Sequence, residues 1–223
     1  MLILIPHSEG KTPGGAGPPL GEAPSPTTGD LIARLNTFDG DAEKLHGVKG
    51  KALAAALEAN ENVLASPTMP AIERYKGVVY QGIDYASLDK KARTHFDKHV
   101  RIVSPLFGLV APRDPLPDYK LRMDKLDAAK LWKPVIAEEL GATFVLDLLP
   151  QAHRKAVACE NGLAVDFYVQ SAGKRKPAAH HGKLVKGKFV RWLCENQIKT
   201  PDEFVEFRDE GYFWDGTRFL KEE

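Results

Sequence analysis

The segment at residues 46–51, HGVKGK, has the residue types and the spacing that can hold a phosphate group. Glycine lets the backbone adopt positive φ values and lets a phosphate approach closely, and Gly47 and Gly50 supply two such positions. The alanine-rich run that follows predicts a helix, whose first N–H groups have no partner within the helix and point toward a bound anion. Lys49 and Lys51 add positive charge at the same place. A contact of this kind holds a nucleic-acid backbone without reading its bases.

Two interpretations of this segment are open. In the first, residues at about 41–64 form a helix-hairpin-helix, with a short helix over 41–45, Val48 between the two glycines of the link, and a second helix over 51–64. In the second, the segment is an ordinary turn between helices, and Gly47 is the residue that ends the first helix. Helix-hairpin-helix elements are often used in pairs, and this sequence pattern occurs once.

A second set of polar residues is candidate machinery for an enzyme that acts on nucleic acid or on a nucleotide-like ligand. Lysine, arginine and carboxylate side chains together suit phosphate handling and acid–base chemistry. The simplest alternative for two of them is a structural ion pair between Asp114 and Arg122. The catalytic candidates for a positively charged cleft are Lys11, Tyr80, Asp114, Tyr119 and Arg122, with Lys183 and Arg191 as further cations.

The stretch from 174 to 188 is the strongest local concentration of positive charge in the chain. No acidic residue interrupts it, and Arg191 follows one helical turn later. A solvated basic loop is one interpretation, and electrostatic attraction of nucleic acid is the other. For DNA binding we expect the attraction to come from Lys183, Lys186 and Arg191.

Other patterns do not meet the requirements of common sites. Lys11 and Thr12 follow a strand, but a phosphate-binding loop of the G-x-x-x-x-G-K-T type needs glycine where Ile5 stands. His95 and His99 are spaced to share one helical face, which together with nearby carboxylates suits ferrous iron, although the ligand set is incomplete and surface histidines are the simpler interpretation. We expect no metal and no cofactor.

Mixed helices and strands must position these residues. Continuous apolar runs predict buried strands over 2–5 and 143–149, and a strand is also expected over 78–80. Residues 7–29 are rich in proline and glycine and predict a loop. One helix is expected to begin at Thr28-Gly29-Asp30. Separate helical patterns lie over 88–99, 131–140 and 189–197. The tail at 211–220 predicts a hairpin that turns at Asp215-Gly216. We therefore expect a mixed α/β fold and one compact domain over 1–223.

Composition excludes several classes of protein. The chain has 223 residues, of which 43% are hydrophobic and 27% charged, as in ordinary globular domains. The net charge of +1 predicts no general attraction to polyanions, so any affinity for nucleic acid needs a local patch. The opening MLILIP is too short for a signal peptide or a membrane span. With two cysteines, Cys159 and Cys194, in neither metal nor disulfide spacing, we expect a cytoplasmic protein with no membrane partner.

Three long motifs resemble the YaaA family of bacterial peroxide-stress proteins, and the resemblance covers nearly the whole chain. The motifs are YKGVVYQG at 75–82, HVRIVSPLFGLVAPRDPLPDYKLRM at 99–123, and KLVKGKFVRWLCENQIKTPDEFVEFRDEGYFWD at 183–215. The family's lysine and threonine after the first strand are present as Lys11 and Thr12. Other family positions are matched by Ser104, Gly108, Pro112, Asp114, Tyr119, Arg122 and Met123.

The resemblance implies a single-domain mixed α/β fold with an embedded helix-hairpin-helix. It also implies DNA binding, protection of DNA and of the cell during hydrogen peroxide stress, and a link to lower free intracellular iron. A positively charged cleft in the family suggests an enzymatic activity that has not been assigned, and therefore a small ligand of unknown identity.

Two places depart from the family pattern. The first loop reads His-Ser-Glu-Gly before Lys11, where Ser-Pro-Ala is commoner. The segment Asp147–Pro150, followed by His153, stands where the family often has Asn-Leu-Ala-Ser and then a tyrosine. If a reaction depends on that serine or asparagine, this chain has lost the reaction or changed its substrate.

Overall fold

The main sheet places four parallel strands side by side, with their carboxyl ends at one edge. The computed structural model describes residues 1–171, 173–178 and 180–222. Parallel pairing joins neighbouring strands throughout the sheet except at one edge, where β4 runs antiparallel to β3. The order is β4 (Gly108–Val110), β3 (Val100–Ser104), β1 (Leu2–Pro6), β6 (Val145–Asp147) and β7 (Gly162–Ala164).

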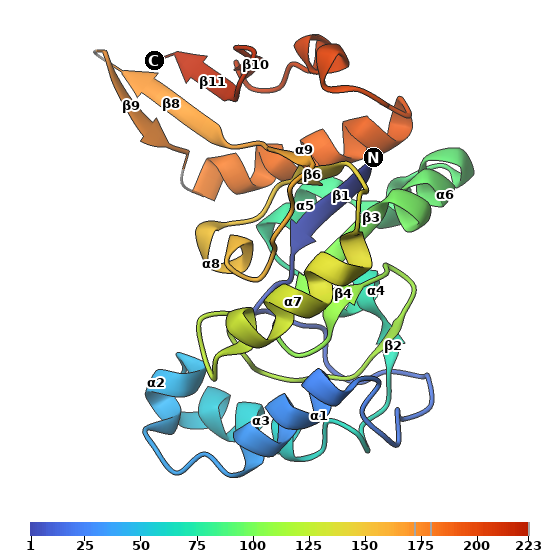
Figure 1. Ribbon diagram of the computed structural model, residues 1–223, viewed down its shortest axis with the longest axis vertical. Helices are drawn as coiled ribbons and strands as arrows, with labels where there is room; N and C mark the ends of the chain where they lie inside the picture. The colour runs from blue at the N-terminus through green and yellow to red at the C-terminus, as the bar shows by residue number, and fades with distance from the viewer. Residues whose placement is uncertain (172, 179, 223) are drawn as a thin grey trace.

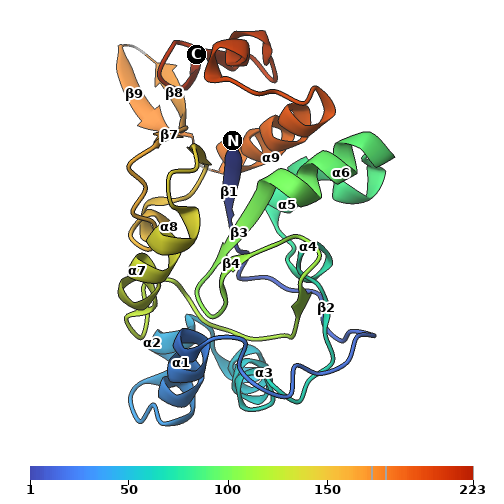
Figure 2. The same ribbon diagram turned by 45° about the vertical axis from the view of Figure 1, so that its right-hand side comes forward.

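Helices cover both faces of this sheet, which explains why its central strands are apolar without interruption. Ile3, Leu4 and Ile5 of β1 are at most 1% exposed. In Figure 2, helices α7 (Ala128–Leu140) and α8 (Gln151–Arg154) lie on one side of β1 and β3. The other side carries α5 (Val78–Ile83), the short 3₁₀ helix η1 (Tyr85–Ser87), α6 (Lys90–His99) and α9 (His180–Glu195).

Two smaller groups of elements lie at opposite ends of the molecule (Figure 1). Beyond the carboxyl ends of the parallel strands lie α1 (Pro26–Asn36), α2 (Ala42–His46) and α3 (Gly50–Glu61), with α4 (Ala71–Arg74) and the paired strands β2 (Met69–Pro70) and β5 (Pro115–Leu116) nearby. At the opposite end a second sheet has the order β10 (Phe213–Trp214), β11 (Phe219–Glu222), β8 (Phe167–Ser171) and β9 (Lys174–Pro177), beside the 3₁₀ helix η2 (Pro201–Glu206).

The mixed α/β class expected from the sequence is confirmed, and so are several elements. The predicted strands over 2–5 and 143–149 correspond to β1 and β6. The tail forms the predicted hairpin, because Trp214 pairs with Phe219 on either side of the turn at Asp215-Gly216. No helix within the described residues has both the length and the apolar character that a membrane crossing requires.

One local prediction is wrong, and one of the two interpretations of the basic segment does not hold. Residues 78–80 are helical rather than extended, although Val78 and Val79 are β-branched. The basic segment 174–188 is not a solvated loop, because its described residues form β9 and the first half of α9. At residues 78–80, packing outweighs the preference of the local sequence.

The packing that makes 78–83 helical is a close crossing of α5 and α9. A Cβ atom on Gly187 would lie 2.1 Å from the carbonyl oxygen of Val79, and one on Gly82 would lie 2.3 Å from the carbonyl oxygen of Leu184. Neither distance is compatible with a side chain, so the two backbones touch through their glycines. α9 therefore anchors α5 against the sheet.

Replacing Gly187 with alanine is expected to destabilise the protein, because the new methyl group meets backbone that cannot move aside. We expect the free energy of unfolding to fall by about 2 kcal/mol or more, which urea unfolding measures. The matched control is Gly29→Ala in α1, where the added Cβ meets its nearest atom at 3.7 Å. That control should be neutral or stabilising, since alanine favours a helix. Equal stability of the two variants would contradict the close crossing.

Candidate functional site

Polar residues follow the parallel strands at the edge where these strands end. His7 comes directly after β1, Ser104 is the last residue of β3, and Asp147 is the last residue of β6. In open α/β sheets, ligands bind in the crevice outside the carboxyl ends of the strands. A ligand site is therefore expected at this edge of the sheet.

The loop that carries Lys11 lies along residues 68–76, a segment that includes α4. The N–H of Thr12 donates to the Arg74 carbonyl at 2.8 Å, and the N–H of Lys76 donates to the Gly10 carbonyl at 3.1 Å. Further along, Gly17 and Thr68 exchange backbone hydrogen bonds. These bonds hold a loop without regular structure of its own in one position, so Lys11 projects from a fixed place.

A buried guanidinium fixes the same loop from within. Arg74 has an exposed fraction of 0%, and its donors reach the carbonyl oxygens of Gly14 at 2.7 Å, Leu116 at 3.1 Å and Pro67 at 3.2 Å, as well as that of Thr12. Four carbonyl groups from three separate segments thus share one side chain. Burial lowers the pKa of Arg74 from its ordinary value, while Asp118 acts in the opposite direction.

The ammonium group of Lys11 sits among aromatic rings instead of beside a carboxylate. Its Nζ lies 4.0 Å from the ring centre of Tyr119 and 5.6 Å from that of Tyr75, and it donates to the Ser8 carbonyl at 3.3 Å. Burial lowers the pKa of Lys11 to about 7, against the opposing effect of the Asp118 carboxylate. Near neutral pH a large fraction of Lys11 is therefore the free amine, which can act as a base or a nucleophile.

Three hydroxyl groups form a directed chain behind Lys11. The Oγ of Ser104 accepts the N–H groups of Leu106 and Phe107 at 3.2 and 3.0 Å, which occupies both of its lone pairs. Its own proton must then go to the hydroxyl of Tyr119, 2.8 Å away, and Tyr119 in turn donates to Tyr75 at 2.6 Å. The chain ends on the hydroxyl of Tyr75, a residue that is 2% exposed.

Tyr80 closes this group on the side of β1. Its hydroxyl donates to the Pro6 carbonyl at 2.9 Å, and its ring centre lies 5.8 Å from that of Tyr75. Burial raises the pKa of Tyr80 well above its ordinary value. Tyr80 thus supports the wall of the site and does not supply a free polar group to it.

Charged residues link the site to the helices beyond it. Lys120 pairs with Glu9 at 3.0 Å, and Arg122 pairs with Asp124 at 3.1 Å and with Glu9 at 4.0 Å. A Cβ atom on Gly47 would lie 3.1 Å from Nη1 of Arg122, so the guanidinium lies against the turn between α2 and α3. The alternative of an ion pair between Asp114 and Arg122 is not what forms, because Arg122 pairs with Asp124 and Glu9, and the Asp114 carboxylate accepts the N–H of Ala111 at 2.7 Å.

The turn between α2 and α3 has the backbone geometry that its glycines allow. Gly47 ends α2 with a φ of 67°, and Gly50 begins α3 with a φ of 55°. Lys49 and Lys51 are exposed, and Lys49 reaches Glu43 at 3.0 Å. Asn60 of α3 bonds the backbone of Lys120 through both its amide oxygen and its amide nitrogen, which secures the helix pair to the segment next to Lys11.

The structure does not bring all of the candidate site residues together. Lys11 and Tyr119 are in contact, Tyr80 packs nearby, and Arg122 borders them through Glu9. Arg191 instead donates to the carbonyls of Ile83 and Asp84 at 3.2 and 3.0 Å. Asp114 and Arg191 therefore make their contacts elsewhere, and Lys183 is exposed on α9.

Several cations of the basic segment and of the helix that continues it are engaged with other groups of the protein. Lys188 pairs with Asp209 at 3.1 Å and with Glu210 at 2.9 Å. Arg191 pairs with Glu195 at 2.8 Å. Lys186 donates to the Leu148 carbonyl at 2.7 Å, and burial lowers its pKa to about 8. The cations that remain exposed are Lys174, Arg175 and Lys176 of β9, together with Lys183.

Two buried histidines at this edge form a pair that the sequence did not predict. His7 and His153 are each 8% exposed, and Nδ1 of His7 lies 2.7 Å from Nε2 of His153. Each residue occupies one of the two departures from the family pattern, so the departures meet in space. In the sequence, His7 and His153 were notable only because each lies in a departure from the family pattern, and nothing connected the two positions. Tyr75 and Ser104 were likewise missed, although both lie within motifs that carry the resemblance.

The histidine pair is held together by a shared hydrogen bond. Two nitrogens bound to one tetrahedral metal ion stand about 3.3 Å apart, whereas these are in direct hydrogen-bond contact. Burial is the main reason that the pKa of His7 lies well below its ordinary value, and it lowers the pKa of His153 to about 4. Both rings are neutral at physiological pH, and the outer atoms, Nε2 of His7 and Nδ1 of His153, have no hydrogen-bond partner among the described residues.

The iron hypothesis for His95 and His99 finds no support in the geometry. Their rings stack at 4.3 Å between centres, and lysines, not carboxylates, surround them. Within the described residues, no three His, Cys, Asp or Glu side chains lie together as a metal site requires.

Comparisons with known proteins extend over nearly the whole chain. The sequence model of a family described as "Peroxide stress protein YaaA" matches residues 1–218. A UPF0246 protein of Corynebacterium glutamicum (strain R) is 34% identical over 226 residues, which covers 92% of this chain and 90% of the relative. A UPF0246 protein of Streptomyces coelicolor is 33% identical over 236 residues and covers 95% and 91%. A UPF0246 protein of Lactobacillus delbrueckii subsp. bulgaricus is 28% identical over 226 residues, covering 95% and 92%.

Lys11 is expected to react with acetic anhydride with a pH midpoint near 7, because the neutral amine is the reactive form and the pKa of Lys11 is about 7. Competitive labelling followed by mass spectrometry measures this midpoint for each lysine. Lys133, which is exposed on α7, is the internal control for the labelling of a surface lysine. Asp118→Asn should lower the Lys11 midpoint further, because it removes a carboxylate that favours the ammonium form. A Lys11 midpoint near 10 would contradict this description.

Proposed function

This chain belongs to the YaaA family of peroxide stress proteins, and we propose that it protects DNA under hydrogen peroxide stress by binding the phosphate backbone. The observation that carries the proposal is the α2–α3 turn, where two glycines with positive φ precede the first turn of a helix. In this proposal the turn is a helix-hairpin-helix motif, formed by Gly47, Val48, Lys49, Gly50 and Lys51.

The geometry of the turn supports a phosphate ligand at the start of α3. The first N–H groups of a helix have no partner within it, and the helix dipole favours an anion there. Lys49, the residue before α3, makes no side-chain cap. A Cβ atom at Gly50 would meet no other atom within 4 Å, so the space above this glycine is open to solvent. A phosphate can therefore approach the backbone at the place where its charge is stabilised.

Cations from other parts of the chain extend this contact. Arg122 lies against Gly47, and its pairing with exposed Asp124 and Glu9 leaves it able to rearrange toward a phosphate. Lys183 adds attraction at longer range, whereas Lys186 and Arg191 are engaged with backbone oxygens and contribute less. Because every contact is with the backbone, binding should be independent of base sequence and should weaken steeply with salt.

Gly50→Ala is expected to weaken DNA binding at least fivefold, because the methyl group occupies the space through which the phosphate approaches. Fluorescence anisotropy of a labelled duplex, measured across a salt series, gives the affinity and the salt slope. The matched control is Gly21→Ala: Gly21 also has a positive φ, 75°, and its Cβ would also meet nothing within 4 Å. Both variants carry the same kind of backbone strain, and only Gly50→Ala should lose affinity.

Lys51→Ala should reduce the salt slope by about one, since it removes one phosphate contact. Unchanged affinity in both Gly50→Ala and Lys51→Ala would reduce the segment to an ordinary turn. A base-sequence preference that survives high salt would also count against backbone binding.

A second candidate function is an enzyme that acts on a nucleotide-like ligand or on nucleic acid at Lys11. The observation that favours it is a lysine with a pKa of about 7 in front of a chain of hydroxyl groups that ends on Tyr75. An amine that can take up a proton beside a fixed hydroxyl donor suits acid–base or covalent chemistry on a phosphorylated substrate. Arg122 and Lys120 supply charge at its border.

Ligand protection of Lys11 is the test of this second candidate. A nucleotide that binds the site should slow acetylation of Lys11 at pH 7 at least fivefold and leave that of Lys133 unchanged. Tyr75→Phe removes the hydroxyl group at the end of the chain and should weaken this protection. If a panel of mono-, di- and triphosphate nucleotides at millimolar concentration leaves the Lys11 rate unaltered, the site does not take this class of ligand.

A further inference from the structure

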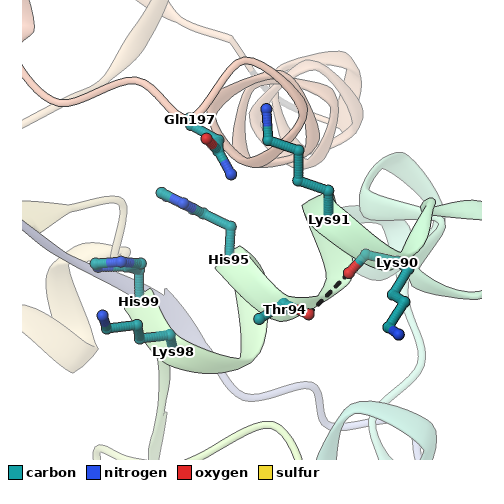
Figure 3. A pocket seen from close by; sticks show the side chains of 7 residues that line it. All are labelled: Lys90, Lys91, Thr94, His95, Lys98, His99 and Gln197. Carbon is teal, nitrogen blue, oxygen red and sulfur yellow. Dashed lines mark hydrogen bonds between the residues drawn. The ribbon is translucent and has the colours of Figure 1, made fainter.

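A surface hollow between α6 and the end of α9 is lined by cationic and neutral polar groups. Its volume is about 530 Å³, and its lining contains no carboxylate. We call it the α6 hollow (Figure 3), and its lining residues are Lys90, Lys91, Thr94, His95, Lys98, His99 and Gln197. It lies on α6, away from the α2–α3 turn at the far end of the molecule (Figure 1).

The helix itself concentrates these cations on one side. Lys91, His95 and Lys98 follow one another at intervals of four and three residues, which places them on the same helical face. The carboxylate of Asp97, on the same helix, accepts the Tyr85 hydroxyl at 2.8 Å and is occupied there. One face of α6 is therefore positive without a compensating acid in the hollow.

The lysines of the hollow are also not neutralised by other parts of the chain. Across the described residues, none of the ammonium groups of Lys90, Lys91 and Lys98 forms an ion pair. This differs from Lys120 and Lys188, which both pair with carboxylates. Unpaired cations that surround a concave surface raise the local concentration of anions.

Gln197 provides an independent sign that the hollow is built for a ligand. It follows α9 with a φ of 52°, a conformation that glycine adopts without strain and other residues rarely do. The hydrogen bond from the N–H of Ile198 to the Leu193 carbonyl, 3.0 Å long, is the bond of a helix end that usually has glycine at this position. Figure 3 shows its amide directed into the same space as His95 and Lys91. The strained position thus places a neutral donor in the hollow.

The two histidines of the hollow, His95 and His99, are placed where they can face a bound anion. Nδ1 of His99 contacts the Met1 carbonyl at 3.0 Å, which directs its Nε2 away from the backbone. Burial is the main cause that lowers the pKa of His95, and His99, Lys98 and the amino group of Met1 lower it further. Lys91 on the same helix and neutral Gln197 complete its surroundings, so a bound anion would be the first negative group facing His95.

We propose that the α6 hollow binds a small phosphorylated compound with two or more closely spaced negative charges, such as a diphosphate. Lys91, Lys98 and His95 contact the phosphate oxygens, and the Gln197 amide donates to one of them. This site is separate from the DNA backbone contact at the α2–α3 turn and from the Lys11 site. Binding is coupled to proton uptake by His95, so affinity increases as the pH falls from 8 to 6.

Isothermal titration of the full chain with inorganic pyrophosphate tests the proposal. We expect one site per chain, and both Lys91→Ala and Lys98→Ala should weaken binding at least fivefold. The matched control, Lys133→Ala on α7, makes the same charge change on another helix and should leave the affinity within twofold of wild type. Gln197→Gly should raise Tm, because it relieves the backbone strain, and should weaken pyrophosphate binding severalfold.

A second measurement follows His95 directly by the NMR signals of its ring protons. Pyrophosphate should raise the pKa of His95, and His95→Gln should remove most of the pH dependence of binding. Absence of pyrophosphate binding, or equal binding by wild type and Lys91→Ala, overturns the proposal. It is also overturned if Gly50→Ala and not Lys91→Ala loses pyrophosphate, or if Lys91 and Lys98 matter only for binding of an oligothymidylate.

Discussion

The fully buried guanidinium of Arg74 is the interaction on which the candidate site depends. Because Arg74 is 0% exposed, its donors would lie buried without partners, at a cost of about 1–3 kcal/mol each, if they did not reach the carbonyl groups of Thr12, Gly14, Pro67 and Leu116. The proline- and glycine-rich loop has few apolar side chains to hold it in place. The guanidinium of Arg74 therefore holds this loop in place through its hydrogen bonds, as a helix or strand would do through backbone bonds. The position of Lys11 is fixed as a result.

The contents of the site follow from that arrangement. A lysine held beside buried aromatic rings has no carboxylate partner close enough to keep it fully charged, so its pKa falls to about 7. Behind it, Ser104 is saturated by two backbone donors, and this sets the direction of every hydroxyl up to Tyr75. The neutral pair His7 and His153 completes a polar interior at the strand ends. Burial shifts the pKa values of Lys11, Tyr119 and both histidines, and such shifts are typical of functional sites.

Charge in this protein is organised locally. With a net charge of +1, the molecule as a whole attracts polyanions weakly. Asp209 and Glu210 pair with Lys188 of α9, and Glu43 pairs with Lys49 at the α2–α3 turn, whereas no carboxylate lines the α6 hollow. Cations at two separate parts of the structure, the α2–α3 turn and the α6 hollow, are consistent with two different anionic ligands.

The sequence by itself determined the elements whose signal is local. The apolar runs of β1 and β6, the glycines of the α2–α3 turn, the tail hairpin and the family membership all followed from neighbouring residues or from contiguous motifs. Tertiary structure decided the rest. Helix α5 formed against its β-branched residues because Gly82 and Gly187 let two backbones touch. The meeting of His7 with His153, the burial that changes the pKa of Lys11, and the pairing of the basic segment with distant carboxylates all depend on contacts between residues far apart in the chain. Such contacts leave no periodic pattern in a single sequence, because only the folded chain brings their partners within range.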